Sequence, residues 1–137
     1  MDTVFGLISV FVLVGLNGFF VAAEFSLVGA RRTRLAQLAK DGNAGAVAAE
    51  KAIEHIDSFI AATQLGITLA SLGLGWIGEP AVSHLIEPLL ENILPHEMTE
   101  TVVPALGIAI GFSFVTLLHI VMGELVPKSI ALQRPEN

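Results

Sequence analysis

Three long apolar runs dominate the pattern of hydrophobic and polar positions along the chain. They cover about residues 4–29, 58–78 and 101–124. The first contains one charged residue, Glu24, the second contains none, and the third contains only Glu124 at its end. Each run has about the 20 residues that a helix needs to cross a hydrocarbon core of roughly 30 Å. The runs are continuous rather than alternating, which excludes barrel strands, and we predict three transmembrane helices.

The segments between the runs are predicted to be amphipathic juxtamembrane helices. Residues 31–56 form one or two helices broken near Gly42, with apolar and basic positions that suit a helix lying on anionic headgroups. From Val82 to Ile93 the apolar residues recur at helical spacing, and Pro88 is expected to kink that helix. Four glycines weaken the second run as a helix, so we predict that it forms either a short helix or a partly re-entrant one. They are Gly66, Gly73, Gly75 and Gly78.

Composition supports an all-α membrane domain over residues 1–137. Hydrophobic residues make up 53% of the chain and charged residues only 15%, with a mean hydropathy of +0.74. A soluble domain carries about a quarter charged residues, and one of this length could not bury so much apolar surface. The net charge of −6 and the lack of a basic stripe exclude a nucleic-acid partner. The absence of cysteine excludes disulfides and thiolate metal sites.

Basic residues predict the orientation in the membrane. All seven Lys and Arg lie within residues 31–51 or after residue 127, whereas the connection between the second and third runs carries glutamates. The positive-inside rule therefore places residues 31–56 and the C-terminus in the cytosol, and three crossings place the N-terminus outside the cell membrane.

Polar residues within the first two runs are candidates for function, because they are costly at membrane depth. Asn17 and Glu24 are seven residues apart and share one helix face. Glu24 either binds a cation or a partner within the bundle, or lies at the cytosolic headgroups. Gln64, Thr68 and Ser71 form a polar stripe that either lines a cavity or bonds neighbouring helices.

The end of the third run, Gly123-Glu124-Leu125-Val126-Pro127-Lys128, is the most informative segment. Pro127 cannot donate to the carbonyl four residues earlier, which frees the Gly123 carbonyl beside the Glu124 carboxylate. Oxygen atoms of this kind suit a hard cation such as Mg²⁺, Ca²⁺ or Na⁺. The alternative is a helix end at the interface, anchored to headgroups by Lys128.

Other chemistry finds little support in the sequence. Three of the four histidines lie between the apolar runs without metal-ligand spacing, and His119 is expected to form hydrogen bonds within the bundle. No nucleophile triad, phosphate loop or dinucleotide fingerprint is present. We therefore predict no enzymatic activity.

Three motifs together resemble the membrane domain of the CNNM/CorC family, whose bacterial members are also described as hemolysin-like. They are Asn17-Gly18-Phe19-Phe20-Val21-Ala22-Ala23-Glu24 with the following arginines, Gln64-Leu65-Gly66-Ile67-Thr68-Leu69-Ala70-Ser71, and the segment from Gly123 to Lys128. The resemblance covers essentially the whole chain. The asparagines that many members carry in the second motif are replaced here at Ile67, Thr68 and Ser71.

The resemblance implies a homodimeric domain that exports Mg²⁺ in exchange for Na⁺ and is followed by cytosolic CBS domains. It implies an ion held by the first two helices and by the Gly-Glu of the third. We therefore predict a site made of Glu124, Gly123, Glu24, Thr68, Ser71 and Gln64. The alternative function is a membrane anchor or signalling scaffold for the CBS domains, without transport of its own.

Overall fold

The computed structural model describes residues 3–135, and every regular element in that range is helical. Three segments are long and apolar enough to cross a membrane: Thr3–Gly29, Ile56–Glu91 and Val102–Gln133. The fold class predicted from the sequence, three membrane helices with additional short helices, is therefore confirmed. The elements in chain order are α1 (Thr3–Gly29), α2 (Arg32–Lys40), α3 (Ala44–Glu54), α4 (Ile56–Gly73), η1 (Leu74–Gly78), α5 (Glu79–Glu91), η2 (His96–Met98), α6 (Val102–Leu118), η3 (His119–Leu125) and α7 (Val126–Gln133).

The second and third membrane segments are longer than the sequence predicts. The short π-helical segment η1 joins α4 to α5, so helical structure continues from Ile56 to Glu91 without a re-entrant turn. A second π-helical segment, η3, joins α6 to α7 and carries the third segment past residue 124 to Gln133. The glycines of the second run lie inside the helix because several of them face neighbouring helices, where a side chain would not fit.

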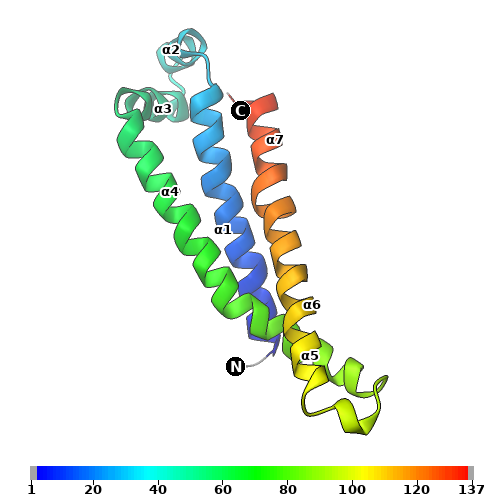
Figure 1. Cartoon of the computed structure of the whole chain (residues 1–137). Coiled ribbons are helices and arrows are strands. Elements are labelled where there is room, and N and C mark those ends of the chain that lie inside the picture. The colour runs from blue at the N-terminus through cyan, green and yellow to red at the C-terminus, as the bar shows by residue number, and fades with distance from the viewer. Residues whose placement is uncertain (1–2, 136–137) are drawn as a thin grey trace.

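Helix α1 lies between the other two segments and forms the core of the bundle (Figure 1). Its buried residues Val10, Val14, Asn17 and Val21 recur every three or four positions, which places them along one helix face. Val10 and Val14 pack with Leu74 of η1 and with side chains of α5 and α6. Most large apolar side chains outside this core are exposed on the single chain, as expected for a surface that meets lipid.

The two ends of the bundle differ in what they carry. The N-terminus and α5 lie at one end, and α2, α3 and the C-terminus lie at the other (Figure 1). The predicted break near Gly42 is confirmed: this glycine has a φ of +85°, and the Asn43 side chain caps α3 by accepting from the Ala46 amide at 3.1 Å. Leu35 of α2 is buried against α3 and the end of α1. The apolar face of α2 is therefore covered by protein and is not laid into the membrane.

Candidate functional site

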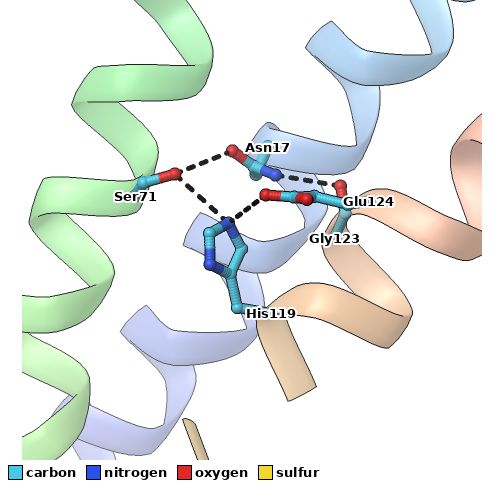
Figure 2. A network of polar contacts seen from close by, with 5 residues as sticks. All are labelled: Asn17, Ser71, His119, Gly123 and Glu124. Carbon is cyan, nitrogen blue, oxygen red and sulfur yellow. Dashed lines mark hydrogen bonds and ion pairs between the residues drawn. The ribbon is translucent and has the colours of Figure 1, made fainter. Parts of the chain in front are cut away.

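Five polar groups from the three membrane segments meet inside the bundle (Figure 2). Asn17 of α1 is fully buried and donates from Nδ2 to the Gly123 carbonyl at 2.9 Å. The Ser71 hydroxyl of α4 donates to Asn17 Oδ1 at 3.3 Å. The same hydroxyl lies 3.2 Å from His119 Nε2, and that nitrogen lies 3.5 Å from Glu124 Oε1. We call these five residues the inner cluster.

The π-helical segment η3 explains why a backbone carbonyl is present in the inner cluster. Pro127 follows Gly123 by four residues and offers no amide hydrogen. The helix is wider at this point, and the Val126 amide donates to the Val121 carbonyl five residues earlier. The Gly123 carbonyl accepts a hydrogen bond from the side-chain amide of Asn17. This agrees with the prediction that Pro127 leaves the carbonyl free to accept from a group outside its own helix.

Glycine at position 123 is required by the close approach of the two helices. A Cβ atom there would lie 3.0 Å from His119 Cδ2 and 3.2 Å from Asn17 Nδ2. Both distances are shorter than ordinary van der Waals contacts, so a larger residue would push the amide away from the carbonyl.

A second group of polar side chains, the outer cluster, is built from Glu24, Thr63 and Gln64. The Thr63 hydroxyl lies 3.1 Å from Glu24 Oε2 and 2.9 Å from the Ile60 carbonyl of its own helix, so its one proton is shared between the two acceptors. Gln64 Nε2 lies 3.3 Å from Glu24 Oε1. Glu24 is therefore held by α4 within the bundle. Thr63 is 4% exposed, whereas Gln64 is exposed and Glu24 is partly exposed. The Glu24 carboxylate therefore contacts the protein interior on one side and is accessible from the surface of the bundle on the other.

The antiparallel packing of α1 and α4 fixes the relation between the two clusters. Asn17 pairs with Ser71 and Glu24 pairs with Gln64, so a step of seven residues up α1 matches a step of seven down α4. Seven residues of α-helix rise about 10 Å. The two clusters are therefore about 10 Å apart along α1. The outer cluster is closer to the end that carries α2 and α3, because Glu24 follows Asn17 toward Gly29, where α1 ends.

The structure divides the predicted site residues into three groups. Glu124, Gly123 and Ser71 lie together in the inner cluster, and Glu24 and Gln64 lie in the outer cluster. Thr68 joins neither, because its exposed hydroxyl donates to the Gln64 carbonyl of its own helix at 2.8 Å.

The predicted site omitted three residues that complete the clusters. Asn17 and His119 bond the three helices in the inner cluster, and Thr63 supports Glu24 in the outer one. The signal for Asn17 was present in the sequence, since it shares a helix face with Glu24. Thr63 lies one residue before the polar stripe and gave no comparable signal.

Each cluster offers oxygen atoms that could act as metal ligands, and each contains one carboxylate. Within residues 3–135, no three His, Cys, Asp or Glu side chains gather in a way that could hold a metal ion by themselves. In the inner cluster the oxygen atoms come from an amide, a hydroxyl, a backbone carbonyl and the Glu124 carboxylate. The Glu124 side chain is 45% exposed on the single chain, so an ion could reach it. Such a set suits a hard cation that keeps part of its water shell.

The fold and these clusters define a multi-pass membrane domain with a polar centre inside a helical bundle. A model of the family described as "Cyclin M transmembrane N-terminal domain" matches residues 7–137. The chain therefore belongs to the CNNM family, and the resemblance seen in its motifs is confirmed.

Proteins of Bacillus subtilis and Mycobacterium tuberculosis resemble nearly all or all of the chain. UPF0053 protein YhdT of Bacillus subtilis is 44% identical over 137 residues, which cover all of this chain and 29% of that protein. UPF0053 protein YugS of the same organism is 42% identical over 131 residues, or 95% of this chain and 30% of the relative. Rv1841c of Mycobacterium tuberculosis is 41% identical over 137 residues, or all of this chain and 38% of the relative. The chain thus spans between about three tenths and two fifths of these relatives.

Proposed function

We propose that this domain transports divalent cations across the cell membrane, with Mg²⁺ as the exported ion and Na⁺ as the coupling ion. The observation that carries the proposal is the inner cluster, in which polar groups from three membrane segments are joined by hydrogen bonds and bring several oxygen atoms together. Polar groups at this depth are expensive unless they serve a function or bond the helices together. Transport would proceed by exposing the cluster alternately to the two sides of the membrane.

The ligands would be the Glu124 carboxylate and the Gly123 carbonyl, with the Ser71 hydroxyl and Asn17 Oδ1 at the edge of the ion's water shell. Mg²⁺ takes six oxygen ligands in near-octahedral geometry and gives up water reluctantly. A site with one carboxylate and few side-chain oxygens fits an ion that keeps several waters. The pair between His119 and Glu124 would have to open to admit the ion, since Glu124 Oε1 is engaged there at 3.5 Å.

The outer cluster would lie on the route of the ion between the inner cluster and the cytosol. Its carboxylate, Glu24, is held in place by Thr63 while remaining reachable. The basic residues that follow α1 and α7 support a cytosolic location for this end of the bundle, because basic residues favour the cytosolic side. Since the chain contains no cysteine, single cysteines can test the orientation. We expect His96→Cys to react with an impermeant thiol reagent on intact cells, and Lys51→Cys to react only after permeabilisation.

The family resemblance suggests a homodimer and cytosolic CBS domains in the full-length protein. The exposed apolar faces of α4 and α6 offer a surface that a second copy or lipid could cover. Glu124 is nearly half exposed on the single chain, so a partner copy could also enclose the site.

Cation-dependent thermal stability of the purified protein tests transport against the alternative of a membrane anchor. We expect millimolar Mg²⁺ to raise the melting temperature, because a ligand that binds only the folded state stabilises it. Glu124→Ala should abolish this rise. Glu91→Ala removes the same charge at the exposed end of α5, outside both clusters, and should preserve it.

Ion flux into or out of liposomes provides the functional readout. The parent and the Glu91→Ala variant should move Mg²⁺, and Glu124→Ala should not. If neither Mg²⁺ nor Na⁺ changes the stability of the parent and no flux is seen, the anchor function replaces the transport proposal.

A further inference from the structure

Helix α2 carries a concavity whose lining differs from that of the two clusters. Its volume is about 540 Å³, and Arg31, Thr33, Arg34 and Gln37 line it. Thr33, Arg34 and Gln37 each carry a group that can donate a hydrogen bond, and none of the lining side chains is a carboxylate. We propose that this concavity binds the phosphate group of an anionic phospholipid headgroup. The inference is independent of cation transport.

The position of α2 fits a ligand at headgroup depth. Helix α1 ends at Gly29, and α2 begins at Arg32. Each residue of chain spans at most about 3.6 Å, so Arg31 lies within roughly 7 Å of the end of the membrane helix. The headgroup layer is about 5–8 Å thick on each side of the hydrocarbon core. The concavity therefore opens where lipid phosphates lie.

The packing of α2 favours recognition of a headgroup over insertion of an apolar face. Leu35 is buried against α3, with Leu38 packed against the same small core. The side of α2 that remains available is polar and basic, as the exposure of Thr33, Arg34 and Gln37 shows. Attraction to an anionic surface then depends on charge and hydrogen bonding rather than on buried apolar area.

The two sides of α2 differ in charge, which identifies the side that binds an anion. Arg32 shares a separate concavity of about 220 Å³ with Glu50 and Glu54 of α3. Those carboxylates offset its charge and would repel a phosphate. Arg34 faces the side lined by donors, where its planar guanidinium can bind two phosphate oxygens at once. Thr33 and Gln37 can donate to the remaining oxygens.

Native mass spectrometry of the purified protein, titrated with phosphatidylglycerol or phosphatidylcholine, tests the proposal. The parent should bind phosphatidylglycerol in preference to phosphatidylcholine. Arg34→Gln should weaken phosphatidylglycerol binding about fivefold, the effect of one basic residue at an anionic membrane surface. Lys51→Gln removes an equal charge from an exposed position on α3, outside the concavity, and should leave binding within twofold.

A neutral substitution separates a built site from diffuse attraction. Gln37→Ala changes no charge and should still weaken binding about threefold, as expected for one lost hydrogen bond. Equal losses in Arg34→Gln and Lys51→Gln, with no loss in Gln37→Ala, would overturn the proposal in favour of general electrostatics. Equal binding of the two lipids would overturn it as well. Inorganic phosphate supplied alone should not compete at concentrations comparable to the lipid, and full competition would show that the site takes free phosphate instead.

Discussion

Replacing Asn17 with alanine tests the idea that one amide holds the three membrane segments in register. The side chain is fully buried and makes two bonds across helices, to the Gly123 carbonyl at 2.9 Å and from the Ser71 hydroxyl at 3.3 Å. Such bonds in membranes contribute about 0.6 kcal/mol on average and up to about 1.7 kcal/mol. The cavity left by the amide adds roughly 1 kcal/mol. We therefore expect Asn17→Ala to lower the free energy of unfolding by about 2–4 kcal/mol.

Equilibrium unfolding in mixed micelles, with increasing sodium dodecyl sulfate, measures this loss. Ser113→Ala is the control, because the Ser113 hydroxyl is exposed and bonds only to the Ala109 carbonyl of its own helix. It should change stability by less than about 0.5 kcal/mol. Ser71→Ala should cost less than Asn17→Ala, and the double variant should cost less than the sum of the two. An Asn17→Ala protein as stable as the Ser113→Ala control would refute the role given to the amide.

An aspartate at position 17 links the same position to ion binding. Asn17→Asp keeps the shape of the side chain but sets a carboxylate against the Gly123 carbonyl, where the amide donated. Without divalent cations this variant should be less stable than Asn17→Ala, because two acceptors then face each other in a buried site. Millimolar Mg²⁺ should restore more stability to Asn17→Asp than to the parent, since the cluster then holds two carboxylates. An equal response of both proteins to Mg²⁺ would argue against an ion at the inner cluster.

Two further substitutions test the packing of α1 against α4. Thr63→Val should lower the free energy of unfolding by about 1–2 kcal/mol because it removes a hydrogen bond to the Glu24 carboxylate. Thr68→Val should be close to neutral, since the Thr68 hydroxyl bonds to its own helix. Equal melting temperatures for the two variants would contradict the role given to Thr63. Gly66→Ala should cost about 1–3 kcal/mol, since its Cβ would lie 2.6 Å from an aromatic ring of α1. Gly75→Ala is the matched control, with nothing within 4 Å of its Cβ; thermal unfolding of both variants decides whether the contact matters.

The sequence was sufficient to predict the elements that depend on local composition. Long apolar runs identified the three membrane segments, and Gly42 with Asn43 predicted the break between α2 and α3. The combination of Gly123 and Pro127 predicted a carbonyl with altered bonding. Each of these follows from a local property: hydrophobic length, a left-handed turn, or a missing amide hydrogen.

The remaining features depend on how helices meet, which a single sequence does not determine. The choice between Thr63 and Thr68 rests on the rotation of α4 about its axis, and that rotation is fixed by contacts with α1. Phe20 lies against Gly66, so this face of α4 is turned toward α1; Thr63 contacts Glu24, and Thr68 is exposed. The continuity of α4 into α5 was missed for a similar reason. Gly78 weakens an isolated helix, but in the bundle it lets the helix approach Val10.

The division of polar groups into two clusters bears on how the proposed transport could work. The resemblance implies asparagines on the second helix, and here Ser71 stands at one of those positions, with its hydroxyl bonded to Asn17 of the first motif. With one carboxylate in each cluster, neither cluster matches the charge of a divalent ion alone. An ion must be held firmly enough to enter and weakly enough to leave, which several moderate sites achieve better than one strong site. In the proposed transport, the two clusters about 10 Å apart along α1 would be two such moderate sites. Placing a second carboxylate in the inner cluster, as Asn17→Asp does, should therefore strengthen binding and slow transport.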